Sequence, residues 1–251
     1  MAGKSGKGDQ RKKQVASRAP SGRGAGTGGA GSGLMERWPR WVATASAVGL
    51  LLGSSMIALS LYSVSLASQF VPGNTTDPLD YRAKGSATAP VVVADWFDYQ
   101  CPACRILALS REPELEKEYV STGKVRYVSR NYAFLGPESF LAAEASECAA
   151  DQGRYWDYRT LLFQRQQGEN RGAFRTENLK RFAGELGLNQ SSFDGCVDSR
   201  KYRDAIVAET KEGEELGVNA TPTLFINGKQ QRGAPAMDRL RALIDEELAK
   251  K

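Results

Sequence analysis

Cys101 and Cys104 are separated by two residues, in the order Cys-Pro-Ala-Cys. The pair follows an apolar, β-rich run over residues 91–97, and apolar residues recur at helical spacing after it. A thiol at a helix N-terminus faces unpaired backbone N–H groups and the positive end of the helix dipole, which stabilise the thiolate and lower the thiol pKa. A low-pKa cysteine is a good leaving group when its disulfide is attacked, so the pattern predicts dithiol–disulfide exchange. Cys101 is then the nucleophile, and Cys104, one turn later, is the resolving thiol.

The rest of the composition excludes several other kinds of site. None of the 251 residues is histidine, which removes Ser-His-Asp and Cys-His catalysis, histidine-ligated metals and haem held by histidine. Residues 1–40 hold nine Lys/Arg and two Asp/Glu, a net charge of +7, whereas the remaining residues hold 25 basic and 27 acidic side chains, a net of −2. The globular part is therefore not a basic nucleic-acid binder, and we expect no nucleic-acid partner.

The elements that must position the cysteine pair predict a split α/β fold. Residues 91–97 are too continuously apolar for an edge strand with one face in water, so we expect a buried central strand. The helix after it meets Pro113, where a kink or restart is expected, and residues 124–131 alternate as a second strand. Residues 132–217 contain no comparable strand and show helical spacing. The sequence thus predicts a βαβ unit followed by a helical insertion.

The chain returns to strand structure after the insertion. Residues 223–226 form a predicted strand, and Asn227-Gly228 is typical of a type I′ hairpin turn that leads into a short partner at 230–232. Residues 235–250 carry apolar side chains on one face and charged side chains opposite, which predicts a final amphipathic helix. The predicted order is βαβ, helices, ββα.

Two motifs together resemble those of the thioredoxin superfamily. They are Asp-Trp-Phe-Asp-Tyr-Gln-Cys-Pro-Ala-Cys at residues 95–104 and Ala-Thr-Pro-Thr-Leu-Phe-Ile-Asn-Gly at residues 220–228. The intervening helical block makes the chain resemble the DsbA-like branch, which consists of membrane-anchored thiol:disulfide oxidoreductases of the bacterial exterior. The likeness covers about residues 80–251.

The resemblance implies roles for residues around the pair. It implies that Pro222 is cis and packs against the active cysteines, that Thr221 presents its backbone to a substrate peptide, and that Pro102 and Ala103 also lie against substrate. It further implies that Asp95, six residues before Cys101 and flanked mostly by apolar residues, is buried beneath the site and takes part in proton transfer. The Escherichia-type oxidase has His at the position of Ala103, so a cation beside the first thiolate is missing here.

Cys148 and Cys196 lie in the predicted helical block, 48 positions apart. With the first pair they could complete a Cys₄ metal site, although zinc knuckles normally use two Cys-X-X-Cys-like pairs and this chain has one. The alternative is a structural disulfide in an oxidising compartment. The resemblance favours the disulfide, because related DsbA-like proteins often carry one here, and we expect no metal and no cofactor.

The N-terminal residues predict a membrane anchor. Residues 1–40 are rich in Gly, Ser and basic residues and are expected to be a disordered cytoplasmic tail. Residues 41–67 carry no charge and are long enough for a transmembrane helix, with the basic residues on one side, so the positive-inside rule places the following domain outside the cell. Residues 68–90 are predicted to be a linker, and the domain is expected to begin near residue 91. A signal peptide cleaved near Ser65-Leu66-Ala67 is the alternative to this signal-anchor.

The resulting expectation is a single-pass protein of the bacterial cell membrane that oxidises thiols of exported proteins. The resemblance implies reoxidation by a membrane partner of the DsbB or vitamin K epoxide reductase-like type. A membrane-anchored thiol reductase serving cytochrome maturation and a non-enzymatic thioredoxin-fold module that binds peptides are the alternatives. The retention of both Cys101 and Cys104 argues against the redox-inert module.

Overall fold

The computed structural model describes residues 80–250. The predicted cytoplasmic tail, the transmembrane helix at 41–67, the alternative cleavage site and most of the linker lie outside these residues. Within residues 80–250, no helix has the length and apolar character needed to cross a bilayer.

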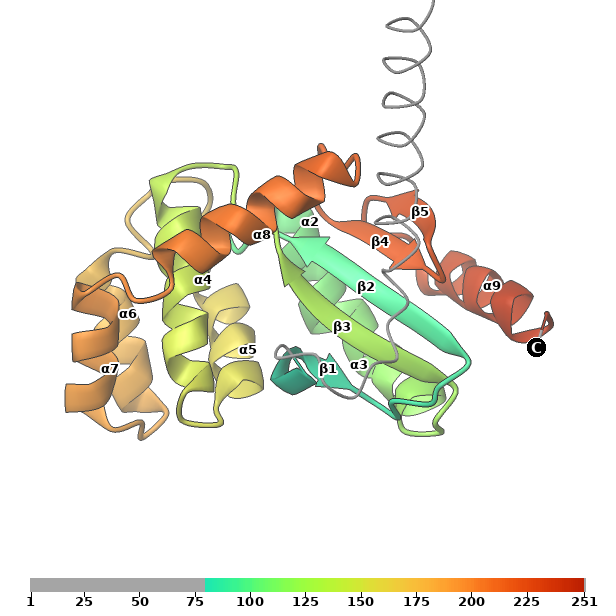
Figure 1. Cartoon of the computed structure of the whole chain (residues 1–251), viewed down its shortest axis with the longest axis horizontal. Coiled ribbons are helices and arrows are strands. Elements are labelled where there is room, and N and C mark those ends of the chain that lie inside the picture. Colours follow the sequence, from blue (N-terminus) through green and yellow to red (C-terminus); the bar gives the residue numbers. More distant parts are fainter. Residues whose placement is uncertain (1–79, 251) are drawn as a thin grey trace, which may run out of the picture. The chain divides into compact units, whose positions relative to one another are not determined.

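A five-stranded sheet forms the centre of the domain, with the strand order β1-β3-β2-β4-β5 (Figure 1). The strands are β1 (Ala83–Lys84), β2 (Val91–Phe97), β3 (Val125–Asn131), β4 (Thr223–Ile226) and β5 (Lys229–Arg232). β2 lies in the middle, parallel to β3 and antiparallel to β4, and all seven of its residues are buried. The prediction of a buried central strand is confirmed.

The alternation of side chains along β2 decides which residues lie beneath the cysteine pair. Val91 and Val93 share a core with side chains from the helices after the pair and from the last helix. Since side chains two residues apart point to the same face, Asp95 lies on that face too, in register with Ser129 of β3. Trp96 points to the opposite face and packs with Tyr132.

One continuous helical run leads from the cysteine pair to β3. It consists of α2 (Pro102–Ile106), the π-helical turn η2 (Leu107–Arg111), α3 (Glu112–Leu115) and the π-helical turn η3 (Glu116–Val120). Pro113 lies in the first turn of α3, directly after η2, so the helix restarts near the residue that lacks a backbone N–H donor. The predicted βαβ unit is confirmed by the parallel pairing of β2 and β3.

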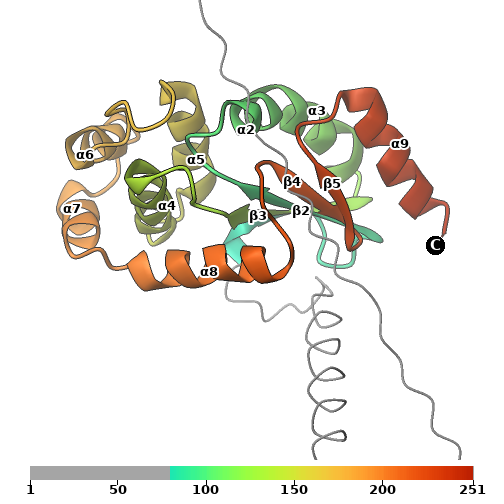
Figure 2. The ribbon, with the colours of Figure 1, turned by 90° about the horizontal axis from the view of Figure 1, so that it is seen from above.

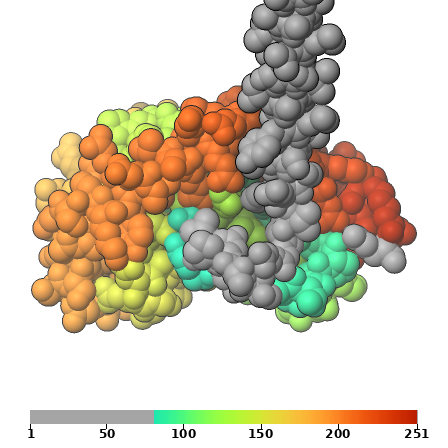
Figure 3. Space-filling view, in the orientation of Figure 1, coloured from blue at the N-terminus to red at the C-terminus, as the bar shows by residue number. Residues whose placement is uncertain are grey.

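The insertion between β3 and β4 is helical, as predicted, and consists of five helices. They are α4 (Pro137–Ala150), α5 (Tyr155–Arg165), α6 (Thr176–Glu185), α7 (Gln190–Asp198) and α8 (Arg203–Glu215). The first four gather beside the sheet, and α8 returns across the face opposite α2 and α3 (Figures 1 and 2). The space-filling view shows α6, α7 and α8 as one continuous surface (Figure 3).

The approach of α8 to the sheet requires a glycine. A Cβ atom at Gly213 would lie 2.7 Å from the Tyr132 ring and 2.9 Å from the Trp96 ring, closer than van der Waals contact permits. Gly213 therefore lets the helix lie directly on these two buried rings.

The C-terminal part follows the predicted hairpin and helix. Asn227 and Gly228 both have positive φ, 45° and 82°, which is the requirement of a type I′ turn between β4 and β5. The last helix, α9 (Met237–Leu248), buries Met237, Leu240 and Ile244 against the sheet core.

The domain begins before the predicted boundary at residue 91. The short helix η1 (Asp80–Arg82) and β1 precede β2, and β1 pairs with the edge of β3. The Arg82 side chain is 3% exposed and forms ion pairs of 2.7 Å with both Glu147 of α4 and Glu209 of α8. The predicted linker at 68–90 thus includes residues that belong to the sheet, and a two-residue strand is too short to leave an alternation pattern in the sequence.

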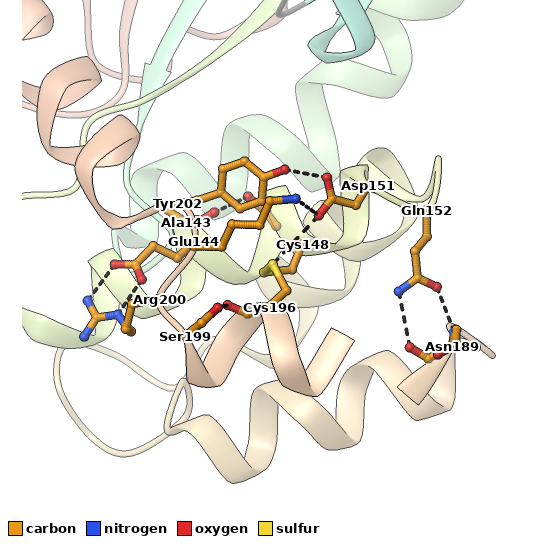
Figure 4. The surroundings of a disulfide bond; sticks show 12 residues. Ala143, Glu144, Cys148, Asp151, Gln152, Asn189, Cys196, Ser199, Arg200 and Tyr202 are labelled. Atoms are coloured by element: carbon orange, nitrogen blue, oxygen red, sulfur yellow. Dashed lines mark hydrogen bonds and ion pairs between the residues drawn. A yellow bond between two sulfur atoms is a disulfide. The ribbon is translucent and has the colours of Figure 1, made fainter. Parts of the chain in front are cut away.

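A disulfide joins Cys148 of α4 to Cys196 of α7, with their Cα atoms 5.9 Å apart (Figure 4). Next to it, Asp151 accepts hydrogen bonds from the ammonium of Lys201, at 2.8 Å, and from the hydroxyl of Tyr202. These bonds tie the end of α4 to the segment after α7. The disulfide also uses both cysteines that a Cys₄ metal site would need.

We predict that replacing both cysteines, Cys148→Ala with Cys196→Ala, lowers the free energy of unfolding by about 4 kcal/mol, because a loop of ~49 residues is no longer closed in the unfolded chain. Chemical denaturation of the oxidised proteins measures this difference. Thiol exchange by Cys101 should persist at low temperature. A folded double variant without exchange activity would show that this disulfide takes part in electron transfer.

Candidate active site

The start of α2 brings the two predicted motifs together. Cys101 is the N-cap residue of α2, and its Sγ lies 3.2 Å from the carbonyl oxygen of Thr221. The peptide bond between Thr221 and Pro222 is cis. Cys101 and Cys104 are both free thiols, with exposed fractions of 7% and 1%. An attacking group thus reaches Cys101 more readily than Cys104.

The two thiols differ strongly in acidity. The pKa of Cys101 is lowered from its ordinary value of 9.0 to about 6, chiefly by a hydrogen bond from the Cys104 thiol and also by backbone N–H groups of Ala103 and Cys104, although burial opposes the shift. The pKa of Cys104 is raised, first by burial and then by the neighbouring Cys101. At neutral pH Cys101 is therefore largely thiolate and Cys104 is thiol. The helix start and the side chain of Thr221 provide this stabilisation although Ala103 offers no cation.

Asp95 is buried on the same side of the sheet, with 1% of its surface exposed. Its Oδ2 accepts a hydrogen bond of 2.7 Å from the Tyr127 hydroxyl and lies 3.4 Å from Nη2 of Arg159. Burial raises the pKa of Asp95 to about 7, against the lowering effect of Arg159 and Tyr127. The negative charge of Asp95 in turn contributes to the raised pKa of Cys104. This carboxyl group can hold or release a proton near neutral pH.

A second buried carboxylate, Asp98, holds the loop before the cysteines. Its Oδ2 accepts hydrogen bonds from the backbone N–H groups of Phe134 and Leu135, at 2.9 and 3.1 Å. Its Oδ1 accepts from the backbone N–H of Gln100, at 2.8 Å, and from the Ser139 hydroxyl, at 2.7 Å. Four donors on one carboxylate fix the loop after β2 to the start of the helical insertion.

The insertion also holds the backbone on either side of Cys101. Nε2 of Gln166 donates hydrogen bonds to the carbonyl oxygens of Tyr99, at 2.6 Å, and Cys101, at 3.0 Å. The amide of Gln100 donates to the Ser139 hydroxyl at 2.8 Å. Residues of α4 and of the segment after α5 therefore position the first residues of α2.

Arg159 of α5 connects Asp95 to a third carboxylate. Its Nη1 lies 2.7 Å from Oε2 of Glu112, and both side chains are almost fully buried. Nζ of Lys84 lies 3.5 Å from the other oxygen of Glu112 and 2.7 Å from Glu116. A row of alternating charges thus runs from the buried Asp95 to Glu116, whose side chain is 47% exposed.

The structure places the predicted site residues in two groups. Cys101, Cys104, Thr221 and Pro222 meet at the start of α2, with Asp95 below on β2, while Pro102 is exposed and Ala103 is partly buried. Cys148 and Cys196 are bonded to each other in the helical insertion.

Sequence reasoning missed five residues of the site. They are Asp98, Glu112, Tyr127, Arg159 and Gln166. For Arg159 a signal was present, because a charged residue stands among the apolar and aromatic residues of one helix face, where a buried charge needs a partner. The identity of that partner depends on the packing of α5 against α3 and could not be read from spacing.

Residues 79–246 match the family model described as Thioredoxin. The chain belongs to the thioredoxin family. It is 29% identical over 173 residues to the probable disulfide bond formation protein D of Bacillus anthracis, which covers 67% of this chain and 79% of that protein. It is also 31% identical over 170 residues to the Na(+)/H(+) antiporter NhaA 3 of Salinispora tropica, where the match covers 67% of this chain but 25% of that protein.

Among solved structures, α-DsbA1 of Wolbachia pipientis shares the fold, with a TM-score of 0.64 and 22% identity over 73% of this chain and 96% of that chain. The chain is thus similar in sequence to a disulfide bond formation protein and in fold to a DsbA protein, and it carries the free cysteine pair of a thiol:disulfide oxidoreductase. The predicted α/β fold with a helical insertion is confirmed.

The acidity of Cys101 predicts how the reduction potential of the pair depends on pH. Reduction takes up two electrons and two protons below about pH 6 but one proton above it, because Cys101 then stays ionised. The potential should fall by about 59 mV per pH unit below pH 6 and by about 30 mV per unit above it. Equilibration with glutathione buffers between pH 5 and 8 measures both slopes.

The Asp95→Asn variant is the control for that titration, because it removes any contribution of the carboxyl near pH 7. The change of slope near pH 6 should remain in this variant. A single slope of about 59 mV throughout the range would contradict the assignment of an ionised Cys101.

Proposed function

We propose that this protein is an extracytoplasmic oxidase that introduces disulfides into exported proteins through Cys101 and Cys104. The observation that carries the proposal is the stabilised thiolate of Cys101 beside the neutral thiol of Cys104. At pH 7 the lowered pKa of Cys101 stabilises the reduced pair only over the one pH unit between about pH 6 and pH 7. This stabilisation is about 1.4 kcal/mol, or about 30 mV in the potential of the pair. A protein with a stabilised reduced form passes its disulfide on to other proteins.

The exchange proceeds in two steps. A substrate thiolate attacks Sγ of Cys101 in the oxidised pair, a bond forms between the two sulfurs, and the bond between Cys101 and Cys104 breaks with Cys104 as the leaving group. A second substrate thiolate then attacks the substrate sulfur of the mixed disulfide and releases Cys101 as a thiolate. The substrate loses two electrons to form its disulfide, and the cysteine pair gains them.

Asp95 donates a proton to Cys104 in this exchange and accepts it in the reverse direction. The leaving sulfur of Cys104 is strongly basic, since its pKa is raised, and it must be protonated as the disulfide opens. With its pKa near 7, Asp95 can supply that proton, directly or through water, and can take it back when Cys104 attacks in the reverse direction.

The substrate peptide is proposed to bind beside the cis peptide bond. The carbonyl oxygen of Thr221 already lies 3.2 Å from Sγ of Cys101, so a peptide bound along Thr221 and Pro222 would present its sulfur to the reactive thiol. Pro102 and Ala103, which follow Cys101 on the first turn of α2, are the other residues proposed to contact the substrate. Binding through backbone groups suits an enzyme that accepts many sequences.

Regeneration of the oxidised pair requires a two-electron acceptor. We propose a membrane reoxidase of the DsbB or vitamin K epoxide reductase-like type, as the resemblance to DsbA-like proteins implies. The direction of the reaction is tested by the potential at pH 7, where a value of about −120 to −180 mV supports an oxidase and one of about −270 mV supports a reductase.

We predict that Cys104→Ala accumulates mixed disulfides through Cys101, because the Cys101 thiolate still attacks substrate disulfides, in the reverse of the exchange, and the Cys104 thiol that would displace the substrate is absent. Expression in the native host, followed by non-reducing electrophoresis, detects these covalent complexes. Cys101→Ala is the matched control, and it should trap few substrates, because Cys104 is 1% exposed and its pKa is raised. If Cys101→Ala traps more than Cys104→Ala, the two roles are reversed.

The proposed location is the outer side of a bacterial cell membrane, with a single N-terminal anchor. The uncharged residues 41–67 and the net charge of +7 over residues 1–40 support this orientation. Protease added to intact spheroplasts should digest the C-terminal domain and leave an N-terminal tag protected, as immunoblotting would show. Protection of the C-terminal domain until the cells are lysed would contradict the proposed topology.

A further inference from the structure

Two carboxylates and one guanidinium, those of Asp95, Glu112 and Arg159, come from three different elements and meet on one side of the sheet. The guanidinium of Arg159 is shared between two carboxylates, at 2.7 Å from Glu112 and 3.4 Å from Asp95. The other oxygen of Asp95, Oδ1, is buried and has no hydrogen-bond partner among residues 80–250. Asp95 therefore receives less compensation for its burial than Glu112 receives.

We infer that Glu112 and Arg159 are positioning residues that set the ionisation of Asp95, with Glu112 holding the guanidinium in an ion pair and so leaving Asp95 only partly neutralised. The inference rests on the proposed proton transfer by Asp95 for its functional meaning. The arrangement of charges on which it depends is independent of that role.

The position of Arg159 is fixed by aromatic rings. The guanidinium carbon lies 4.8 Å from the centre of the Phe97 ring, 5.1 Å from that of Phe163 and 5.2 Å from that of Trp156. With 1% of its surface exposed, the side chain has little space in which to move toward Asp95. Packing and the Glu112 ion pair thus act together to keep Nη2 at 3.4 Å.

Other titratable groups face this cluster of Asp95, Glu112 and Arg159 from the neighbouring elements. They are Tyr127 of β3, Tyr155 of α5, Cys101 and Cys104 at the start of α2, and Lys84 of β1, which reaches Glu112. The residue opposite Asp95 on β4 is Leu224, which carries no charge. Burial raises the pKa of Asp95 most strongly. The charge of Arg159 and the hydrogen bond from Tyr127 lower this pKa, whereas the charges of Glu112 and Cys101 raise it.

The signs of these effects lead to opposite expectations for two substitutions. Glu112→Gln removes a like charge and also the ion pair that competes for the guanidinium of Arg159, and both changes favour the ionised form of Asp95. The double variant, Glu112→Gln with Arg159→Gln, removes both charges. Arg159, which favours the ionised form of Asp95, has the larger effect, and Glu112, which disfavours that form, has the smaller one, so Asp95 should hold its proton to higher pH. A structural role alone would not move the titration in two directions.

The test is a titration of the Asp95 carboxyl carbon by carbon-13 NMR in the reduced protein, with the signal assigned through Asp95→Asn. We expect a midpoint near pH 7 in the wild type. In Glu112→Gln it should fall to about pH 6, and in the double variant it should rise above the wild-type value. Glu116→Gln is the matched control: it removes an equal charge from the partly exposed outer end of the same row, and the midpoint should stay at the wild-type value.

An unchanged or higher midpoint in Glu112→Gln, or an equal change in Glu116→Gln, overturns the inference. If Glu112→Gln does not fold, the double variant decides, and a midpoint at or below the wild-type value overturns it. The pH profile of mixed-disulfide resolution is measured on the same proteins. If the NMR midpoints move as expected and this profile does not follow, the proton-transfer role of Asp95 is wrong while the control of its ionisation by Glu112 and Arg159 holds.

Discussion

A negative charge on the sulfur of Cys101 has to be stabilised at the start of α2, and Ala103 contributes no cation to that task. The Cys104 thiol, the side chain of Thr221 and the backbone N–H groups of the first turn provide the stabilisation. These donors act only when the helix starts at residue 102 and when Cys101 occupies the N-cap. The position of the helix start relative to β2 and to the cis peptide bond is therefore the constraint that the surrounding structure satisfies.

The helical insertion does much of this positioning. Ser139 and Gln166 hold the loop from outside the sheet, and Asp98 ties that loop to the beginning of the insertion. Arg159 reaches from α5 into the space beneath the cysteines. The βαβ unit places the thiol pair between a strand and a helix. The contacts with the insertion hold the backbone around Cys101 and place the charge of Arg159 near Asp95.

Much of this fold could be predicted because its signals are local. The apolar run of β2, the Asn227-Gly228 turn and the face of α9 each leave a pattern within a few residues, and the structure contains all three elements. The position of the thiol pair between a strand and a helix was equally readable. The contacts of Asp98 with the helical insertion and the contacts of Arg159 were not, because they join residues that lie 36 to 64 positions apart and depend on how whole helices pack. The strand β1 was missed for a different reason, since two residues carry no periodicity.

The docking of Arg82 has a mechanical consequence. Its two buried ion pairs lead to α4 and α8, while β1 adds pairing to β3, at the edge of the sheet. A pulling force applied to the N-terminal end of the domain would be carried first by these contacts, in the helical insertion and the outer strands. The strand that leads to Cys101, β2, lies one position inside β3 in the sheet, so a pull on the N-terminal end of the domain is borne by elements other than the one that holds the reactive sulfur.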